Sequence, residues 1–430
     1  MDKKIEPRIL QGFRDLPTEQ AEDKINLTRR IEKICRLFGF SPLETPALEY
    51  SDILLGKYGS EGEKLIYKFK DLGEREIALR YDLTVPLARY IAMNYRELAL
   101  PFKRYQIGQV WRAEKPQKGR FREFCQFDAD IVGTSSVQSE AEIIYLGFKV
   151  LKELGIDDFT IFLNSRKFFM SFFSKNNIKL EDQNRILQII DKLDKIGADD
   201  VIQELSKLEL SNDTIDQIKK LLNTTNNDEA KIELKEIDPN EFEKLENLLQ
   251  ILKDYGITEE NIKIDPALAR GLDYYTGFIF EFKLNQAREF GSVIGGGRYD
   301  QLTNMFSNED FECVGFSFGI DRIIEALKAL NIPLQDKKSK ILFIFDAETQ
   351  EKSFPIIEEL RKNEITTEIY LNESDLGKKI KYADKKKIST VIIFEKPELE
   401  KNIVKIKDMD SGEQKEITLD IEKIVQSIKN

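Results

Sequence analysis

The sequence predicts an α+β protein in which an antiparallel sheet flanked by helices, interrupted by a helical insertion, is followed by a smaller α/β domain. Three observations support this fold class. Residues 102–111 and 122–131 have near-alternating apolar patterns on either side of a polar, glycine-containing segment, as in a long antiparallel hairpin. Residues 165–256 have helical spacing of apolar side chains and no strong strand pattern. From residue 341, strand patterns alternate with helical ones.

The remaining elements follow in chain order. Residues 21–40 have the spacing of an amphipathic helix that ends at Gly39. Short extended runs are expected at 64–69 and 76–80, and strands return at 278–282 and 311–318, before a helix after Asp321. The C-terminal pattern is strand, helix, strand, helix, strand, which favours a mainly parallel sheet; its ranges are 341–345, 354–362, 367–371, 375–387 and 390–395.

These patterns divide the chain into domains. We expect a large first domain at 1–330, with the helical insertion at about 165–260. A linker at 331–340, which contains Pro333 and a charged run, then leads to a second domain at 341–430. A length of 430 residues fits roughly two or three domains of about 150 residues each.

Composition excludes several classes of protein. The hydrophobic fraction is 41% and the charged fraction 33%, as in a globular protein, and no apolar run approaches the ~18 residues of a membrane span. The first residues lack the apolar core of a signal peptide. Three widely spaced cysteines argue against a disulfide scaffold. We therefore expect a cytoplasmic protein with no membrane partner.

The most informative count is zero: the sequence has no histidine. This excludes a Ser-His-Asp or Cys-His catalytic pair, a histidine-ligated zinc and an imidazole general base. Any chemistry must use carboxylates, arginines, lysines, tyrosines or bound ions. The net charge of −11 argues against a protein that coats nucleic acid with its whole surface, but it leaves room for a local basic site.

One local basic site is the predicted hairpin. Residues 101–125 contain seven basic and two acidic side chains, with Arg112 and Arg122 on either side of the turn. Paired guanidiniums suit phosphate because each offers a planar fork of donors. On composition alone, a solvated basic hairpin is the better interpretation.

Three further segments carry possible chemistry. Residues 294–300 are glycine-rich but match neither a P-loop nor the dinucleotide fingerprint, so a structural turn or a close backbone approach to a ligand is expected. Residues 269–277 place Arg270, an acid and two tyrosines beside glycines. Asp128 and Asp130 are two apart on a predicted strand and so share a face. They could bind a metal or a cationic substrate, although in isolation a water-facing pair is favoured.

Together these segments resemble the bacterial-type histidyl-tRNA synthetases, which are class II aminoacyl-tRNA synthetases, over nearly the whole chain. Residues 11–17, 38–46, 112–124 and 315–322 are similar to the family's opening segment and to class motifs 1, 2 and 3. Residues 270–275 and 296–300 resemble two segments specific to the histidine enzymes. The resemblance implies a class II catalytic domain, a C-terminal anticodon-binding domain, a homodimer, and ATP, Mg²⁺, L-histidine and tRNA-His as substrates, cofactor and partners.

The resemblance also implies roles for individual residues. Arg112 and Arg270 are expected to be catalytic, by neutralising the reacting phosphate. The histidine site should comprise Asp82, Leu83, Thr84, Arg112, Gln126, Asp130, Arg270, Tyr274 and Tyr275. The ATP site should comprise Arg112, Glu114, Arg120, Phe124 and Arg322. Contacts to tRNA are expected from Lys115, Gln117, Lys118, Lys378, Lys379 and Lys385, and no protein-held metal is expected.

The chemistry of amino-acid activation fits this residue set. A carboxylate attacks the α-phosphorus of ATP, so two anions must be brought together by positive charge, and no protein base is needed. A site that hydrogen-bonds both imidazole nitrogens can reject analogues by roughly 10⁴-fold. Family members often have histidine at positions 113 and 125, where this chain has Ala113 and Cys125, and glycine where it has Gln301.

Other functions remain open at this point. The main alternative is a catalytically inactive, synthetase-like regulatory subunit of a histidine-biosynthetic ATP phosphoribosyltransferase. Such subunits tend to lose the ATP-site arginines and the anticodon domain, whereas this chain keeps Arg112, Arg270 and Arg322 and continues for about 100 residues past motif 3. A non-catalytic RNA-binding protein would not explain the imidazole-site residues. The absence of histidine results either from selection or from neutral drift.

Overall fold

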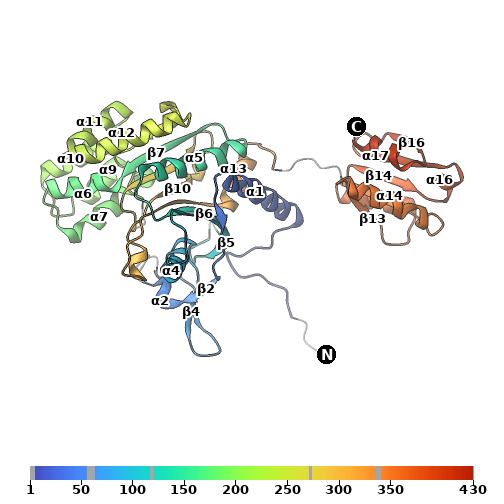
Figure 1. Ribbon diagram of the computed structural model, residues 1–430, viewed down its shortest axis with the longest axis horizontal. Helices are drawn as coiled ribbons and strands as arrows, with labels where there is room; N and C mark the ends of the chain where they lie inside the picture. Colours follow the sequence, from blue (N-terminus) through green and yellow to red (C-terminus); the bar gives the residue numbers. More distant parts are fainter. Residues whose placement is uncertain (1–4, 56–62, 117–120, 271–273, 335–339, 430) are drawn as a thin grey trace. The chain divides into compact units, whose positions relative to one another are not determined.

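The computed structural model of the protein describes residues 5–55, 63–116, 121–270, 274–334 and 340–429. It divides into two compact units, Met1–Leu334 and Gln335–Asn430 (Figure 1). The first unit contains an eight-stranded and a three-stranded sheet, and the second contains a five-stranded sheet. The predicted α+β fold class is confirmed. No helix in the described ranges is long and apolar enough to cross a membrane.

The eight-stranded sheet is the framework of the first unit. Its strand order is β1-β5-β6-β11-β10-β9-β7-β8, antiparallel throughout except for the two outermost pairs. The strands are β1 (Ser41–Pro42), β5 (Phe102–Trp111), β6 (Glu123–Val132), β7 (Phe159–Ser165), β8 (Ile262–Ile264), β9 (Phe278–Leu284), β10 (Ser292–Arg298) and β11 (Cys313–Gly319). The predicted hairpin is therefore confirmed as β5 and β6, which are paired along their whole length.

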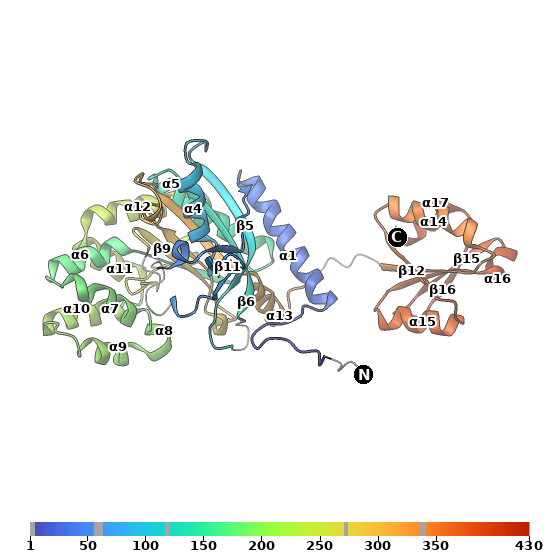
Figure 2. The ribbon, with the colours of Figure 1, turned by 90° about the horizontal axis from the view of Figure 1, so that it is seen from below.

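Three helices cover one face of this sheet: α1 (Thr18–Leu37), α5 (Val137–Glu153) and α13 (Ile320–Ala329) (Figures 1 and 2). Period-2 alternation points Phe127, Phe316 and Phe318 toward them, and these rings pack together with centroids 4.8–6.1 Å apart. All three belong to one buried apolar cluster with the inner faces of the helices. The opposite face of the central strands is thereby left for polar side chains.

A smaller sheet and two helices lie beside this polar face. The sheet has the order β2-β4-β3, with strands β2 (Leu48–Tyr50), β3 (Lys68–Lys70) and β4 (Glu76–Leu79). Helices α2 (Ser51–Leu54) and α4 (Thr84–Asn94) pack with it in a second buried cluster, which includes Leu54, Ala78 and Val85. This arrangement brings the start of α4 to the large sheet.

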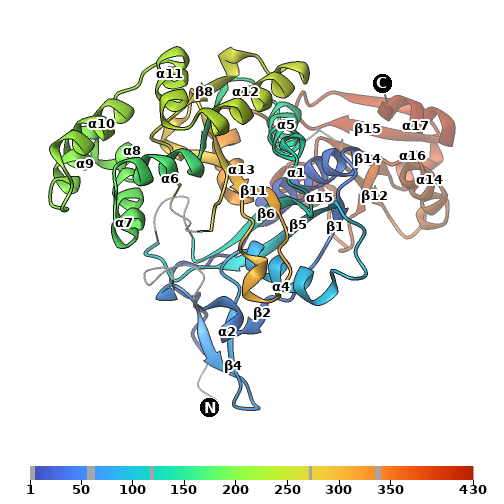
Figure 3. The same cartoon turned by 60° about the vertical axis from the view of Figure 1, so that its left-hand side comes forward.

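The regular elements described between residues 166 and 254 are all helices. They are α6 (Arg166–Lys175), α7 (Leu180–Ile190), α8 (Leu193–Ile196), α9 (Ala198–Leu205), α10 (Asn212–Leu222), α11 (Asn227–Ile237) and α12 (Pro239–Asp254). Helices α6, α7, α9 and α10 form a core of their own, and α7–α10 group at one side of the unit (Figure 3). Residues of α11 and α12, including Leu234, Phe242 and Leu245, instead join the core of the large sheet. The predicted insertion thus has two parts.

The second unit is a five-stranded sheet between helices. Its order is β13-β12-β14-β15-β16. Its elements are β12 (Lys340–Phe345), α14 (Gln350–Lys362), β13 (Thr366–Ile369), α15 (Leu376–Lys385), β14 (Thr390–Phe394), α16 (Lys396–Glu400), β15 (Ile403–Asp408), β16 (Gln414–Thr418) and α17 (Ile421–Lys429). Helices α14 and α17 lie on one face and α15 on the other (Figure 2).

Two predictions about these elements need correction. The sheet of the second unit is only partly parallel, because β15 and β16 add an antiparallel hairpin after three parallel strands. The glycine-rich segment 294–300 is no turn: Gly295, Gly296 and Gly297 lie within β10, in the middle of the large sheet. These glycines leave space for groups that approach the strand, as described below.

Candidate active site

The polar face of the large sheet carries two buried aspartates side by side on β6. Asp128 is 1% and Asp130 3% exposed, so the water-facing arrangement favoured from sequence alone is wrong. The strand register places Arg104 of β5 opposite Asp130. The Arg104 side chain is fully buried, with Nη2 2.7 Å from Asp130 Oδ2 and 3.8 Å from Asp128 Oδ2. A single guanidinium therefore faces both carboxyl groups and lies closer to that of Asp130.

A tyrosine completes the surroundings of Asp130. The buried Tyr299 hydroxyl donates a hydrogen bond to Asp130 Oδ1. The ring of Tyr299 lies 5.9 Å from that of Tyr274, which in turn lies 4.9 Å from Tyr275. Three residues predicted to bind the imidazole ring, Asp130, Tyr274 and Tyr275, therefore lie near one another. Tyr299, which was not predicted, connects them.

Burial controls the charge of the two aspartates. It raises the pKa of Asp128 to about 7, although Arg104 opposes this. Burial also raises the pKa of Asp130, while Arg104 and the Tyr299 hydroxyl oppose the rise. Because Asp130 lies closer to Arg104 and also accepts from Tyr299, we assign the negative charge to Asp130 and the shared proton to Asp128.

A second group of polar side chains surrounds Asp128. Asp82 Oδ1 accepts hydrogen bonds from the backbone N–H groups of Thr84 (3.1 Å) and Val85 (3.0 Å), at the start of α4. Thr84 Oγ1 donates to Asp128 Oδ2 at 3.2 Å, and Gln126 Nε2 donates to Asp128 Oδ1 at 2.8 Å. The predicted residues Thr84 and Gln126 are therefore linked through Asp128, and Asp82 joins this group through the Thr84 N–H.

The backbone of Leu83 also belongs to this site. Its carbonyl accepts from Arg104 Nη2 at 3.3 Å, while its side chain is fully buried. A leucine can contribute here only through packing and its backbone, which ties α4 to the β5 guanidinium.

Arg112 lies at the end of β5, next to the start of β6. Its guanidinium stacks over the rings of Tyr81 (4.4 Å) and Phe124 (5.1 Å), and Nη2 lies 3.4 Å from Gln126 Oε1. Nε also donates to the Tyr81 carbonyl at 3.2 Å. Arg112 is thus oriented by two aromatic rings and two acceptors, close to the Asp128 group. Glu114, which follows it, is half-buried.

The side chain of Arg270 lies over strands β9 and β10, in the middle of the large sheet. Nη1 donates to the Phe280 carbonyl at 3.2 Å and lies 3.4 Å from Glu281 Oε1, and the guanidinium is 5.4 Å from the Tyr275 ring. A Cβ at Gly295 would overlap the Arg270 guanidinium. The glycine in β10 therefore makes room for this cation. Residues 271–273, between Arg270 and Tyr274, lie outside the described residues.

The first turn of α13 contributes two charged residues. Arg322 Nη1 donates to the Ser292 carbonyl at 2.8 Å. Asp321 accepts from the Cys125 N–H (2.9 Å) and forms an ion pair with Arg14 (2.5 Å). Because Gly319 pairs with Gln126, the start of α13 lies next to the start of β6, where Phe124 is found. The strand register thus brings Phe124 and Arg322 to the same end of the sheet.

The structure describes some of the remaining polar residues of the hairpin. The Arg122 side chain donates to the backbone of Glu114 (3.0 Å) and Gln11 (3.4 Å), so it fixes the N-terminal segment and does not pair with Arg112 at a phosphate site. Lys115 is exposed. Gln117, Lys118 and Arg120 lie outside the described residues.

The predicted lysines of the second unit also differ from one another. Lys378 and Lys385 are exposed on α15. Lys379 is 7% exposed, and its Nζ forms a 2.5 Å ion pair with Glu395 at the end of β14. A buried, paired ammonium does not fit the predicted contact with RNA, because α15 turns this position toward the sheet.

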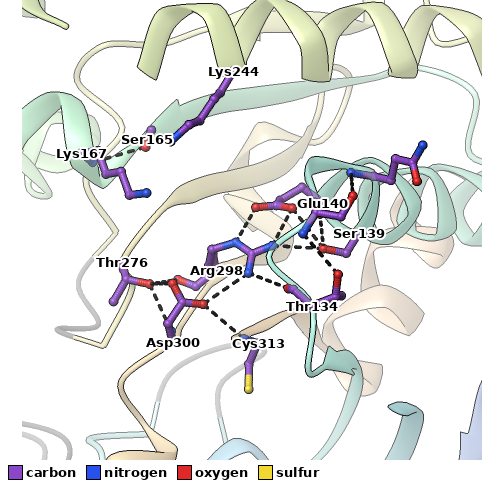
Figure 4. Close-up of polar contacts among 12 residues, drawn as sticks. Thr134, Ser139, Glu140, Ser165, Lys167, Lys244, Thr276, Arg298, Asp300 and Cys313 are labelled. Carbon is purple, nitrogen blue, oxygen red and sulfur yellow. Dashed lines mark hydrogen bonds and ion pairs between the residues drawn. The ribbon is translucent and has the colours of Figure 1, made fainter. Parts of the chain in front are cut away.

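Three important residues were absent from the predicted site: Arg104, Tyr299 and Arg298. Arg298 forms a bidentate ion pair with Glu140 of α5, with Nε 2.5 Å from Oε1 and Nη2 2.7 Å from Oε2 (Figure 4). Its Nη1 lies 3.3 Å from Asp300 Oδ1. This network fixes the end of β10, from which Tyr299 reaches Asp130. The alternation of β5 could have identified Arg104, but Tyr299 required the three-dimensional fold.

Proteins similar to this chain match nearly all of its length. The family described as histidyl-tRNA synthetase matches residues 12–323, and the anticodon binding domain family matches residues 328–430. The histidine–tRNA ligase of Clostridium tetani is 41% identical over 99% of this chain and 99% of its own. That of Helicobacter pylori (strain P12) is 39% identical over 95% of both.

Solved structures give the same result. The crystal structure of histidyl-tRNA synthetase from Nostoc sp. PCC 7120 is similar with a TM-score of 0.86 and 30% identity, covering 99% of each chain. A Bacillus halodurans structure described as an ATP phosphoribosyltransferase regulatory subunit/histidyl-tRNA synthetase has a TM-score of 0.77 at 22% identity, over 92% of this chain and 99% of that one. The latter likeness concerns the fold alone.

Proposed function

The chain belongs to the histidyl-tRNA synthetase family, and we propose that it activates L-histidine with ATP to histidyl-adenylate and transfers the histidyl group to the 3′ end of tRNA-His. The observation that carries this proposal is the buried set of Arg104, Asp130 and Tyr299 beside Tyr274 and Tyr275. A carboxylate and phenol hydroxyls, buried and held in place, suit a ring with one N–H donor and one nitrogen acceptor.

Asp130 and Tyr275 contact the imidazole ring in this proposal, with Tyr274 nearby. Burial of Asp130 excludes water from the ring site, and the adjacent Arg104 favours the ionised carboxylate, which accepts the ring N–H. An analogue without both nitrogens would leave these buried groups unpaired, which is the basis of amino-acid selection.

The ammonium and carboxylate of histidine lie toward the other group of residues. Asp82, Thr84 and Gln126 surround the ammonium, while Arg112 binds the carboxylate and the α-phosphate. The guanidinium of Arg112 already stacks on Tyr81 and Phe124, so it is held in place before the substrates arrive. Arg270, which faces the site across Gly295, supplies the second positive charge for the reacting phosphate.

ATP binds at the end of the sheet where β6 and α13 begin. Phe124 and Arg322 stack on the adenine ring, and Glu114 accepts from its amino group. Mg²⁺ accompanies the ATP phosphates, because this ion is usually held by substrate phosphates with one or two carboxylates. No group of three or more His, Cys, Asp or Glu side chains that could hold a metal forms among the residues the structure describes.

The tRNA partner is contacted by both units. Lys115 and the neighbouring motif 2 residues serve the acceptor end, and the exposed Lys378 and Lys385 on α15 serve the anticodon end through phosphate contacts. The match of residues 328–430 to an anticodon binding domain supports this division of labour.

We also place the protein in the cytoplasm as a homodimer. Its first unit exposes apolar side chains around a groove of about 590 Å³, lined in part by Pro46, Tyr50, Ile53 and Met93. Tyr50 is 54% and Met93 71% exposed, as expected of a surface that a second copy covers. Sedimentation equilibrium should give the mass of two chains.

Amino-acid-dependent ATP–pyrophosphate exchange tests the proposed function. The purified protein is assayed with each of the twenty amino acids, and exchange is expected with histidine alone. A folded protein that binds histidine but supports no exchange with any amino acid would instead favour the regulatory subunit of an ATP phosphoribosyltransferase.

A further inference from the structure

Asp128 is a buried carboxylate that the reaction described above does not use. It is 1% exposed and lies on the same sheet face as Asp130, two residues away. Both of its oxygens are engaged by side chains from two different elements, Gln126 of β6 and Thr84 of α4. These two partners are the residues placed around the substrate ammonium, so Asp128 is in a position to determine how they are oriented.

When Asp128 is ionised, the amide of Gln126 has only one favourable orientation. Its Nε2 donates to Asp128 Oδ1 at 2.8 Å, and its Oε1 lies 3.4 Å from the donor Arg112 Nη2. The flipped amide would set Oε1 against a carboxylate oxygen and an N–H group against the guanidinium. Asp128 and Arg112 therefore hold Gln126 with its oxygen directed away from Asp128.

The hydroxyl of Thr84 is fixed in the same way. Its single proton is given to Asp128 Oδ2 at 3.2 Å, so only lone pairs remain on Thr84 Oγ1. The main chain at Thr84 is held in turn by Asp82, which accepts its N–H. Neither its backbone nor its hydroxyl can turn a donor toward a neighbouring cation.

We propose that Asp128 is a positioning residue that fixes the polarity of Thr84 and Gln126, so that both present oxygen acceptors to the ammonium group of the amino-acid substrate. This inference rests on the proposed function, because the ammonium is that of histidine. Asp128 acts without touching the substrate, and it must be ionised to accept both bonds. Arg104 provides the balancing charge, since its Nη2 lies between Asp128 and Asp130.

The proposal links substrate binding to the protonation of Asp128. Charged or titratable groups that face Asp128 are Arg104 on β5, Arg80 and Asp82 before α4, Asp130 on β6, and the two tyrosines before β9. Burial raises the pKa of Asp128 to about 7, so a proton remains on part of the free protein near neutral pH. Arrival of a cationic ammonium at Thr84 and Gln126 expels that proton.

The first test compares Asp128→Asn with the unchanged protein in the exchange assay, using full-length protein. An asparagine can orient either of its ends toward Gln126, so the fixed polarity is lost. The KM for histidine should rise about tenfold or more, as expected for a lost bond to a charged group, while the KM for ATP changes less than about twofold. Inhibition by imidazole-lactate, which has a hydroxyl in place of the ammonium, should change less than about twofold.

A second substitution separates positioning from a general structural role. In the double variant Asp128→Asn/Gln126→Glu, the asparagine donates to a glutamate that offers oxygens in either orientation. The KM for histidine should return to within about threefold of the original value. Glu241→Gln is the matched control, since Glu241 is a carboxylate 3% exposed on α12 that accepts from Ser165 at 2.7 Å, and it should alter neither KM. An unchanged histidine KM in Asp128→Asn, or no rescue by the double variant, would overturn the proposal.

Proton release by the unsubstituted protein gives a measurement that does not depend on any variant folding. Calorimetric titrations near pH 6.5, in two buffers of different ionisation enthalpy, count protons released on binding. Histidine should release a fraction of a proton that imidazole-lactate does not, because the two ligands share the ring and differ in the ammonium. Equal release by both ligands would refute the role of Asp128. If histidine neither binds nor supports exchange, the proposed function fails first, and the two failures are distinguishable.

Discussion

Gly315 lies directly opposite Asp130 in the pairing of β11 with β6, and a Cβ at Gly315 would overlap Asp130 Oδ1. The same Cβ would lie 2.7 Å from the Ala129 carbonyl oxygen, so neither backbone nor side chain could yield easily. The glycine therefore shapes the surroundings of Asp130, the proposed imidazole ligand, although it has no functional group. Because Gly315 has no side chain, the Asp130 carboxylate has room to lie between Arg104 and Tyr299.

Gly315→Ala should consequently displace the Asp130 carboxylate. We expect kcat/KM for histidine in the exchange assay to fall about 100-fold, as for a displacement of about 1 Å in a site of this kind. The melting temperature, followed by the fluorescence of Trp111, the single tryptophan, should also decrease. In Gly319→Ala, in the same strand, the added Cβ would contact only Arg322 Cβ at 3.7 Å, so this variant should leave the melting temperature unchanged. Full activity in Gly315→Ala would contradict the assigned pocket.

The ion pair of Arg298 and Glu140 should be essential to the stability of the first unit. Both side chains are buried, at 6% and 2% exposure, so Arg298→Met leaves an uncompensated carboxylate inside the protein. We expect a loss of about 3–5 kcal/mol in the free energy of unfolding, measured with denaturant. Adding Glu140→Met should recover part of this loss. The exposed pair Lys70 and Glu74 is a control for which substitution should change little.

Much of this arrangement could be predicted from the sequence. The β5–β6 hairpin, α1, the helical character of the insertion and the first elements of the second unit follow from the period of the apolar residues. The candidate site residues follow from a resemblance of motifs, and the structure joins Asp82, Thr84 and Gln126 to Asp128 in one hydrogen-bonded group. Local periodicity and motif order are properties of the chain alone.

What could not be predicted depends on distant segments meeting. Asp128 and Asp130 were expected to face water in isolation, because nothing nearby in sequence shows that α4 covers them and that Arg104 faces both. The glycines of β10 suggest a turn until Arg270 is known to lie across Gly295. Lys379 differs from its neighbours only because α15 turns it toward Glu395. In each case, tertiary packing overrides the composition of the segment.

The stability of the free protein should depend on pH through Asp128. Its folded-state pKa, about 7, lies above the ordinary value of 3.8, so between these values the folded state holds more protons than the unfolded state. The stabilisation is fully present below about pH 4 and is lost as the pH rises through 7. One proton corresponds to a slope of up to about 1.4 kcal/mol per pH unit.

Asp128→Asn should therefore reduce the decrease in unfolding free energy between pH 5 and pH 8, measured by Trp111 fluorescence without substrates. Asp157→Asn is the control, because that side chain is 79% exposed. Identical pH profiles for Asp128→Asn and the unsubstituted protein would show that Asp128 is ionised throughout this range.

The lysines of α15 should differ in effect according to their burial. Lys378→Ala and Lys385→Ala remove exposed charges, so each should weaken tRNA binding and lower the slope of log affinity against log salt by about 1, with exchange activity unaffected. Lys379→Ala instead breaks the 2.5 Å ion pair with Glu395, so the backbone amides of residues 340–429 should exchange their hydrogens faster. The slope of log tRNA affinity against log salt should not change in this variant. A changed salt slope in Lys379→Ala, with normal hydrogen exchange, would mean that this ammonium reaches RNA after all. An unchanged tRNA affinity in both Lys378→Ala and Lys385→Ala would remove α15 from the RNA-binding surface, because these are the predicted contacts whose side chains remain accessible on that helix.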